Sequence, residues 1–400
     1  MPTPLIDKDE ALWAACGRLA EDPQWTARML GDDDALRPVL LAYGPVARRN
    51  QYQAMLYARA RAHGFWPLPI QKLPLFGKVP SVGPVACHLH WVHELTARAP
   101  DEAAADAGVE QWTRLVARIK ANGHAIVWTV HNVLPHESSW PDHDVAVHRL
   151  VAGAADVVHV MTAASRALCA PHYGWAPEKE LLVPHPSYER AQTDWLARAD
   201  ARAMLGLPDE AFVLLSFGAV LRYKGFERVM RLMDRLAAEV GRPLRWLVAG
   251  QASDADLVQQ LRAWAAMRSD TLLDIRPVPN EDLQEYFRAA DAALCPYERT
   301  LNSGAALMAV SFGLPVIGPR TGGFVDNLGD ACAHLYTPGD DDSLVAAVRS
   351  AAAEPPGSRQ EACRALSEAL SPGQVSARFH QGLRARLSDF LAPVHGAILE

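Results

Sequence analysis

Short apolar runs alternate with amphipathic stretches along most of the chain, and this alternation predicts its elements. In the first half we expect strands at 38–43, 85–91, 125–130, 157–161 and 181–183, and helices at 51–63, 101–121, 144–154 and 164–173. Strands and helices that follow one another in this order predict a parallel, doubly wound α/β sheet with helices on both faces.

The alternation lapses near residues 184–198 and then starts again. The second set predicts strands at 212–217, 245–249, 272–277, 292–295 and 315–317, and helices at 226–240, 255–267, 281–290, 305–312 and 342–353. We therefore expect two Rossmann-like domains, 1–190 with a helical lead-in at 1–37 and 191–372. The remaining segment, 373–400, is expected to carry a helix that packs back on the N-terminal domain.

Composition agrees with two globular domains, since the chain has 400 residues and half of them are apolar. The net charge of −7 argues against bulk nucleic-acid binding. The six cysteines are scattered without metal-site spacing, which is typical of reduced core residues in a cytoplasmic protein. No apolar run reaches the ~18 residues that a spanning helix needs, and the N-terminus lacks the pattern of a signal peptide. We expect a cytoplasmic protein without a metal cofactor.

The loop after the strand expected at 212–217 places unusual residues before a helix. Gly218 allows close approach of a ligand, and Arg222 and Lys224 bring two cations to the helix start. A solvated basic turn would be the ordinary explanation for such a pair. Its position between a buried strand and a helix favours a diphosphate site instead.

A second loop, Asn302-Ser303-Gly304, opens the helix expected at 305–312. Ser303 is a suitable N-cap, and the free N–H groups of a first helical turn attract an anion. Capping alone explains these residues equally well, so the loop gains weight only beside Arg222 and Lys224. The pair Gly322-Gly323 is a weaker signal, since it also fits a simple turn.

Histidines gather at two expected strand ends of the N-terminal domain. His131 follows the strand at 125–130, with His136 and Glu137 close behind it. His88 and His90 end the strand at 85–91, where alternation puts both on one face. No carboxylate accompanies them at metal-ligand spacing, so hydrogen bonding to a sugar hydroxyl or an acceptor is preferred over a metal site.

The segments FGAVLRYKGFERVM and DAALCPYERTLNSGAALMAVSFGLPVIGPRTGG resemble the donor-binding region of GT-B glycosyltransferases, and LYTPGDDDSLVAAV is similar to the end of that region. The resemblance is strongest over 212–348, and the group is typified by the family 4 bacterial polysaccharide and glycolipid transferases. It implies two Rossmann-like domains that face each other across a cleft, the C-terminal one holding a nucleoside diphosphate sugar such as a UDP- or GDP-sugar. Such a co-substrate needs no further cofactor. In this resemblance Gly218, Arg222, Lys224, Asn302, Ser303 and Gly304 lie at the diphosphate, and His131 takes the place of a histidine that contacts the donor sugar.

One departure from the family pattern concerns a pair of glutamates. Met308 and Thr300 occupy their positions, and Glu298 is close enough to be a displaced first member. The resemblance therefore does not decide between inversion and retention of configuration. An inverting enzyme needs a general base, for which His131 and Glu137 are the candidates, with His90 behind them.

The segment from Tyr43 to Gly77 is basic and rich in aromatic residues, and 41–100 holds seven basic residues against one acid. An acceptor site with peripheral contact to the inner face of an anionic membrane is one interpretation, and an ordinary solvated helix face with a loop is the other. The function expected is transfer of a sugar to a hydroxyl of a glycan or lipid-linked acceptor in polysaccharide, capsule or glycolipid assembly. The alternatives are a GT-B sugar-nucleotide epimerase and a non-catalytic GT-B-like partner subunit.

Overall fold

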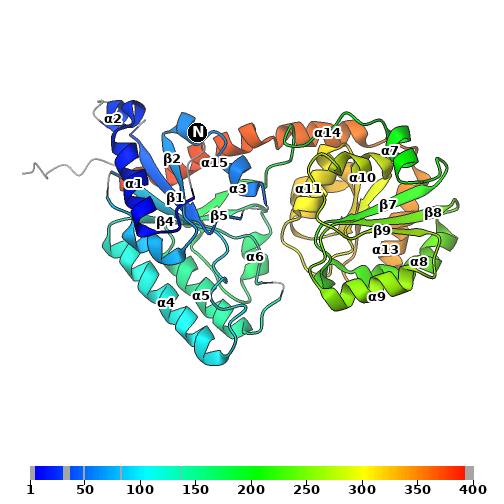
Figure 1. Ribbon diagram of the computed structural model, residues 1–400, viewed down its shortest axis with the longest axis horizontal. Helices are drawn as coiled ribbons and strands as arrows, with labels where there is room; N and C mark the ends of the chain where they lie inside the picture. The colour runs from blue at the N-terminus through cyan, green and yellow to red at the C-terminus, as the bar shows by residue number, and fades with distance from the viewer. Residues whose placement is uncertain (1–4, 30–36, 48–49, 82, 136, 392–400) are drawn as a thin grey trace, which may run out of the picture. The chain divides into compact units, whose positions relative to one another are not determined.

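The computed structural model describes residues 5–29, 37–47, 50–81, 83–135 and 137–391 (Figure 1). The chain forms two compact units, Met1–Pro184 with Gly373–Glu400, and His185–Pro372. The chain first passes from one unit to the other after Pro184, a few residues before the boundary expected at 190. Ser187 belongs to the second unit because its N–H donates to the Leu370 carbonyl at 2.8 Å and its hydroxyl to the Ser367 carbonyl at 2.6 Å.

The first unit contains a six-stranded sheet in the order β2-β1-β3-β4-β5-β6, and every pairing is parallel. The strands are β1 (Val39–Gly44), β2 (Phe65–Pro69), β3 (Val85–Leu89), β4 (Ala125–Thr129), β5 (Val157–Val160) and β6 (Glu180–Leu182). The parallel, doubly wound sheet predicted from the sequence is confirmed. Edge strand β2 was not predicted because it carries Pro67 and Pro69, which fit only where one side of the strand is unpaired.

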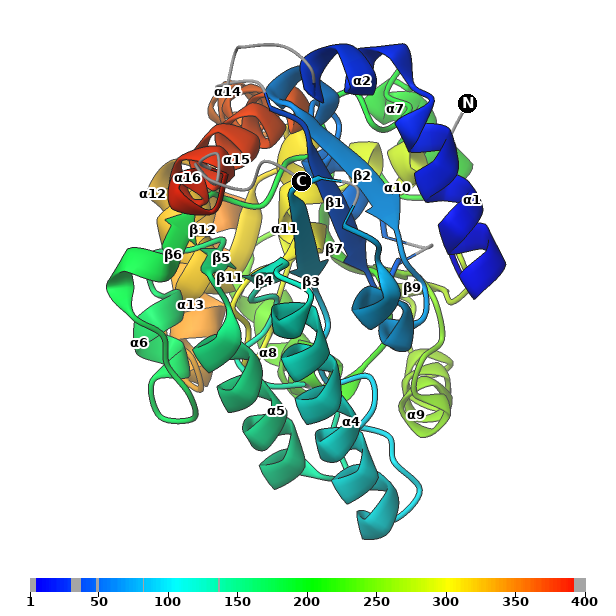
Figure 2. The same ribbon diagram turned by 90° about the vertical axis from the view of Figure 1, so that its left-hand side faces the viewer.

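The helices of the first unit are α1 (Asp9–Ala20), α2 (Pro23–Met29), α3 (Tyr52–Leu56), α4 (Glu102–Ala121), α5 (Pro141–Ala154), α6 (Ser165–Cys169), α15 (Pro372–Arg386) and α16 (Ser388–Leu391). Helices α4 and α5 lie side by side (Figure 2). The single helix expected at 51–63 is wrong. Helix α3 ends at Leu56, and a separate 3-10 turn, Arg61–His63, closes at Gly64 with a φ of 78°.

Helix α15 brings the end of the chain back to the first unit. The Phe379 ring stacks on His88 with the ring centres 5.4 Å apart, and it lies 4.9 Å from the ring of His159. The Ser376 hydroxyl accepts a hydrogen bond from the Arg59 N–H at 2.9 Å. Part of the first unit's core is therefore supplied by residues that follow the second unit in sequence.

The second unit has its own six-stranded parallel sheet, in the order β12-β11-β10-β7-β8-β9. Its strands are β7 (Phe212–Phe217), β8 (Leu244–Ala249), β9 (Thr271–Asp274), β10 (Ala292–Leu294), β11 (Val316–Pro319) and β12 (Ala333–Tyr336). Strand β12 was not predicted, since four residues with a histidine among them give no strong periodicity.

Helices cover both faces of this second sheet (Figure 1). One face carries α8 (Phe226–Glu239), α9 (Ala255–Ala265) and α13 (Asp341–Ala353), and the other carries α7 (Arg198–Met204), α10 (Leu283–Ala289) and α11 (Gly304–Ser311). Helix α14 (Gln360–Ala369) packs against α11, and α12 (Gly329–Cys332) follows a π turn at Phe324–Leu328.

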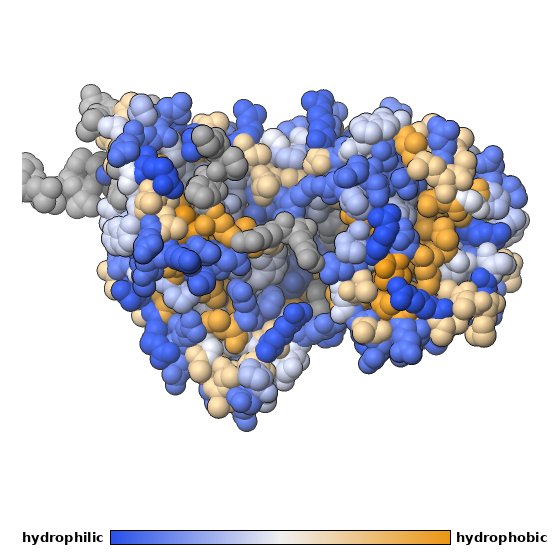
Figure 3. Space-filling model, viewed as in Figure 1, coloured by the Kyte–Doolittle hydropathy of each residue, from blue (hydrophilic) through white to orange (hydrophobic). Residues whose placement is uncertain are grey.

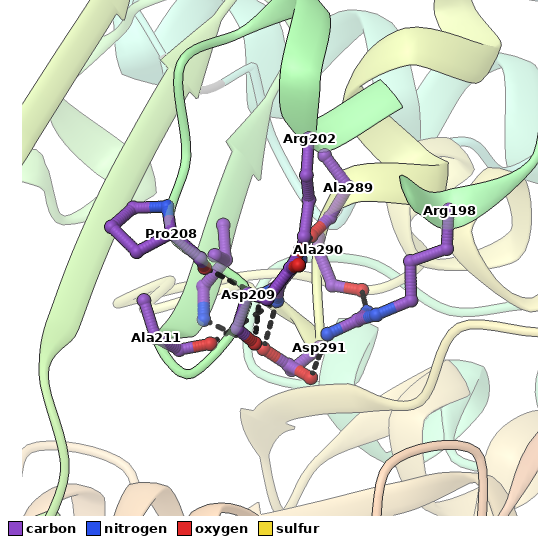
Figure 4. A network of polar contacts seen from close by, with 9 residues as sticks. Arg198, Arg202, Pro208, Asp209, Ala211, Ala289, Ala290 and Asp291 are labelled. Atoms are coloured by element: carbon purple, nitrogen blue, oxygen red, sulfur yellow. Dashed lines mark hydrogen bonds and ion pairs between the residues drawn. The ribbon is translucent and has the colours of Figure 1, made fainter. Parts of the chain in front are cut away.

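A buried arginine anchors α7 to this sheet (Figure 4). Arg202 is 2% exposed, and its guanidinium donates to the carbonyls of Pro208, Asp209, Ala211 and Ala289 and to Asp291 Oδ2. Asp291 also accepts from Arg198 at 2.7 Å and from the Val213 N–H at 2.8 Å. A buried charge is tolerated when its hydrogen bonds are satisfied, and this network ties the start of β7 to the end of α10.

The aromatic residues between Tyr43 and Gly77 belong largely to the core of the first unit. Tyr52, Tyr57, Phe65, Trp66 and Phe76 are all buried there, so their packing accounts for the aromatic content of this segment, and peripheral membrane contact stays a prediction. On the face drawn in Figure 3, hydrophobic residues gather in separate groups on each unit with hydrophilic residues between them. Among the described residues, no helix is both long and apolar enough to cross a membrane.

Each of the six cysteines is buried and has a free thiol. This confirms the expectation of core cysteines, and one of them, Cys295, lies beside Lys224 and Ser303 of the site described below.

Candidate functional site

Three loops of the second unit meet because they follow neighbouring strands β11, β10 and β7. The Glu298 N–H donates to the Tyr223 carbonyl at 3.1 Å, which joins the loop after β10 to the loop after β7. The Gly323 N–H donates to the Leu301 carbonyl at 2.9 Å, which adds the loop after β11. The three sequence signals at 218–224, 302–304 and 322–323 therefore belong to one site.

Lys224 and Gly218 form the cationic part of this site. Gly218 has a φ of 106°, and a Cβ added there would stand 2.9 Å from Lys224 Nζ. Lys224 is 9% exposed, and burial lowers its pKa to about 8. Within the part of the chain that the structure describes, the ammonium makes no hydrogen bond or ion pair. A buried cation without a counter-charge is a strong attractor for an anion.

Arg222 has a different environment from Lys224. It is about half exposed, and its guanidinium contacts Glu227 at 2.7 Å and Asp254 at 3.1 Å. Because two carboxylates already offset its charge, Arg222 attracts an anion less strongly than Lys224 does. The sequence predicted two equivalent cations here and gave no sign of these partners.

The N-terminus of α11 lies at the second loop. The Ser303 hydroxyl accepts from the Ala306 N–H at 3.1 Å, which confirms that Ser303 caps the helix. A Cβ on Gly304 would stand 3.0 Å from the Tyr188 hydroxyl and 4.0 Å from His185 Nε2. Glycine at 304 therefore leaves room for these two side chains beside the helix start.

Asn302 lines a small recess together with Ser303, Gly323 and Asn327 and with apolar residues of α11 and of the turn at Phe324–Leu328. The Nδ2 and Oδ1 atoms of Asn302 are buried and have no hydrogen-bond partner among the described residues. Buried amide atoms are normally paired, so these two are available to a ligand.

The acidic positions of the family pattern are occupied as the sequence indicated. Met308 is buried in α11 and Thr300 donates its hydroxyl hydrogen to the Asn302 carbonyl at 2.9 Å. The Glu298 side chain is exposed, and only its main chain joins the loops of the site.

His185 and Tyr188 are site residues that the sequence reading missed. Burial lowers the pKa of His185 to about 4 and raises that of Tyr188 to about 12, so both are neutral near pH 7. The available signal was the position of His185, Ser187 and Tyr188 directly after the strand expected at 181–183. In the sequence, that segment is marked only by a lapse in the alternation of strands and helices.

In the first unit, His131 lies at the end of β4 and is partly exposed. Its Nε2 is 2.9 Å from His90 Nδ1, and its ring stacks on Trp91 at 4.2 Å between centres. His88 and His90 share a face as predicted, since both bond to the Tyr57 hydroxyl. His131 is thus held on two sides.

Glu137 is exposed in the loop between β4 and α5, and no described side chain pairs with its carboxylate. His136 lies outside the described residues. Across the described ranges, no group of three or more His, Cys, Asp or Glu side chains is arranged to hold a metal ion.

Residues 197–369 match the family model described as glycosyl transferases group 1. The match lies within the second unit. It contains all three loops of the site in the second unit. The resemblance seen in the sequence is therefore confirmed for this domain.

Two curated relatives of the chain have names that give the same activity. D-inositol 3-phosphate glycosyltransferase 1 of Catenulispora acidiphila is 30% identical over 258 residues, which cover 60% of this chain and 61% of the relative. D-inositol 3-phosphate glycosyltransferase of Geodermatophilus obscurus is 29% identical over 211 residues, covering 50% of this chain and 45% of the relative. The chain thus spans less than two thirds of the length of these relatives.

Solved structures show the same fold at low identity. Sucrose-phosphate synthase from Thermosynechococcus elongatus has a TM-score of 0.64 and 17% identity, covering 88% of this chain and all of that one. Anabaena HepE in complex with UDP-glucose has a TM-score of 0.65 and 15% identity, covering 87% and 99%. WaaG, a glycosyltransferase involved in lipopolysaccharide biosynthesis, has a TM-score of 0.58 and 16% identity, covering 86% and 98%. The two parallel-sheet domains therefore have the GT-B glycosyltransferase fold.

Proposed function

We propose that the protein is a glycosyltransferase that moves a sugar from a nucleoside diphosphate sugar to a hydroxyl of an acceptor. The observation that carries this proposal is the buried Lys224 ammonium beside Gly218, within the residues that match the group 1 glycosyl transferase model. When the bond from sugar to diphosphate breaks, negative charge grows on the leaving phosphate. A desolvated ammonium stabilises that charge most in the transition state.

The remaining donor contacts follow from the same loops. The α11 N-terminus and the unpaired amide of Asn302 supply neutral donors to phosphate or ribose oxygens. Arg222 contributes a second, partly offset charge. Because these groups stabilise the charge on the leaving diphosphate, the proposed reaction needs no metal ion. EDTA is therefore expected to leave its rate unchanged. A UDP-sugar is the first donor to test because HepE was solved with UDP-glucose, and a GDP-sugar is the second.

On the acceptor side, we retain a glycan or lipid-linked hydroxyl of polysaccharide or glycolipid assembly, which the likeness to WaaG supports. The names of the curated relatives favour a second candidate, a small phosphorylated alcohol such as D-inositol 3-phosphate. His131 is the proposed contact to the donor sugar. His131 or the exposed Glu137 is the proposed base if the enzyme inverts configuration.

The test begins with thermal unfolding of the purified protein in UDP, GDP, ADP and dTDP. A nucleotide that binds the folded state raises the melting temperature. The donor sugars of the responding nucleotide are then offered with D-inositol 3-phosphate or with a lipid-linked glycan, and released nucleoside diphosphate and product are measured.

Each outcome of this experiment has a defined meaning. Product formation with one acceptor class supports the proposal and assigns the acceptor, and NMR of the product gives its anomeric configuration. Sugar isomerisation without an acceptor would instead show an epimerase. Binding without turnover over the whole panel would show a non-catalytic partner subunit, and no response to any nucleotide would overturn the proposal.

A further inference from the structure

A buried chain of hydrogen bonds in the first unit leads to His131. It runs past the carboxyl ends of β3, β4 and β5, which are neighbours in the sheet. We call it the histidine relay, and its members are His131, His90, Tyr57, His88, Thr129, His159 and the carbonyl of Val183.

The outer half of the histidine relay centres on the Tyr57 hydroxyl. This oxygen lies 2.8 Å from His90 Nε2 and 2.7 Å from His88 Nδ1. His90 Nδ1 then lies 2.9 Å from His131 Nε2. Each ring nitrogen of His90 and the first of His88 thus has a partner.

The inner half continues from His88 to the main chain. His88 Nε2 is 2.7 Å from Thr129 Oγ1, which is 3.0 Å from His159 Nδ1. His159 Nε2 is 2.9 Å from the carbonyl oxygen of Val183. The Val183 carbonyl oxygen can only accept a hydrogen bond, so it fixes the direction of the bond at this end of the relay.

Burial keeps His88 and His90, at the centre of the relay, in their neutral form. His88, Thr129 and His159 have no exposed surface, and His90 is 1% exposed. Burial and the neighbouring histidines lower the pKa of His88 and of His90 well below the ordinary value. A neutral imidazole has one donor nitrogen and one acceptor nitrogen, so the direction of the hydrogen bond at one ring nitrogen fixes the direction of the bond at the other.

The direction can be followed from the carbonyl outward. His159 Nε2–H must donate to Val183, which leaves His159 Nδ1 as an acceptor for the Thr129 hydroxyl. Thr129 Oγ1 then accepts from His88 Nε2–H, and His88 Nδ1 accepts from the Tyr57 hydroxyl.

The same logic continues to His131. The Tyr57 oxygen accepts from His90 Nε2–H, so His90 Nδ1 is an acceptor and His131 Nε2–H must donate to it. Neutral His131 then carries its lone pair on Nδ1, and a group that bonds to this atom has to be a hydrogen-bond donor.

We propose that Tyr57, Thr129 and the relay histidines are positioning residues that fix neutral His131 as its Nε2–H tautomer, so that a ligand hydroxyl that bonds to its Nδ1 must donate the hydrogen. This deepens the proposed function, since under it the ligand hydroxyl belongs to the donor sugar or the acceptor. The tautomer itself depends only on the first unit.

The test is the tautomer of His131 in the full-length protein labelled with 15N-histidine. Two-bond proton–nitrogen spectra distinguish a protonated from an unprotonated ring nitrogen, and the His131→Asn variant assigns its signals. We expect Nε2 protonated and Nδ1 unprotonated in the parent. The opposite tautomer in the parent would overturn the proposal.

Tyr57→Phe removes the central hydroxyl and should turn His131 into a mixture of tautomers. Tyr43→Phe is the matched control, because its ring packs 4.3 Å from that of Tyr57 and its hydroxyl lies outside the relay. Thr129→Val breaks the inner half and gives a second variant if Tyr57→Phe does not fold. An unchanged His131 tautomer in a folded Tyr57→Phe or Thr129→Val protein would refute the proposal.

Kinetics separate this inference from the proposed function. If the protein transfers sugar, Tyr57→Phe is expected to lower kcat at least tenfold with little change in the donor KM, whereas Tyr43→Phe leaves both unchanged. Equal kcat in Tyr57→Phe and the parent would count against the relay. If no sugar is transferred, the tautomer measurement still decides the inference.

Discussion

The Nζ atom of Lys224 stands 2.9 Å from the position that a Cβ on Gly218 would take. The missing side chain at 218 is therefore what admits the buried ammonium to the end of β7. The backbone of Gly218, with a φ of 106°, is also one that other residues rarely adopt. Position 218 therefore favours glycine for two separate reasons, the absence of a side chain and the freedom to adopt this φ.

Replacing Gly218 with Ala is expected to lower the free energy of unfolding by about 1–3 kcal/mol, because an L side chain is strained at this φ. It should also displace the ammonium and weaken UDP binding at least tenfold. Urea unfolding and nucleotide titration measure the two effects. Gly206→Ala is the control, since Gly206 has a φ of 63° with open space around its Cβ position. UDP binding equal to the parent in Gly218→Ala would contradict this prediction.

Replacing Lys224 with Met should separate stability from binding. Burial of the charged side chain costs up to about 3 kcal/mol, given a pKa of about 8 in place of 10.5. The variant is therefore expected to be more stable than the parent without nucleotide at pH 7, yet to have lost UDP binding. Lys72→Met, at an exposed lysine, should change neither property. Retained UDP affinity in Lys224→Met would exclude Lys224 as the phosphate contact.

The lowered pKa of Lys224 also predicts a pH dependence. In the folded protein the side chain loses its proton near pH 8, whereas in the unfolded chain it keeps the proton up to about 10.5. The penalty for burying the charge is complete below pH 8 and is relieved as the pH rises toward 10.5. The stability of the unliganded parent should therefore rise relative to Lys224→Met over this window, while UDP affinity falls above pH 8. Calorimetric titrations from pH 7 to 9.5 check the second trend, and a flat profile would contradict it.

Glu227 offsets part of the charge of Arg222, at 2.7 Å from its guanidinium. Exposed ion pairs contribute up to about 1 kcal/mol, so Glu227→Gln should strengthen UDP binding by a factor of about two to five. Arg222→Gln should weaken it less than Lys224→Met does. Glu239→Gln is the matched control, because Glu239 pairs with Arg235 near the end of the same helix. Weaker binding in Glu227→Gln would show that Arg222 needs its partner for orientation.

Arg202 and Arg198 both donate to Asp291 but differ in burial, at 2% and 37% side-chain exposure. Arg202→Gln removes the buried charge that faces Asp291 and the donors to several carbonyls, and it is expected to destabilise the protein by about 3–5 kcal/mol. Arg198→Gln should cost about 1 kcal/mol or less. Chemical unfolding of the two variants compares them directly, and equal losses would show that burial does not govern this network.

Where apolar runs are strong, the sequence predicted the strands closely, and the structure has β7 at the predicted bounds, Phe212–Phe217. The errors have local causes. The prolines of β2 hide a strand that is stable only at the sheet edge, and the end of α3 at Leu56 depends on contacts that helical periodicity does not encode.

The candidate site, too, could be predicted only in part from the sequence. Loops after strands were predictable, since parallel strands bring their carboxyl ends to one edge, and Gly218, Lys224 and Ser303 lie in such loops. The ion pair from Arg222 to Asp254 joins residues far apart in the sequence, and so does the bond from Tyr57 to His88. Pairings of this kind depend on the complete fold, so no local sequence pattern predicts them.

The packing of Phe379 against His88 and His159 has a consequence for biosynthesis. A ribosome makes residues 185–372 before it makes Phe379, so the second unit has its whole sequence available while the first still lacks α15. Although domains generally fold from the N-terminus during synthesis, here the first unit can close over its histidines only after the second has been translated. The core of the unit that is encoded first is thus completed by the part of the chain that is translated last.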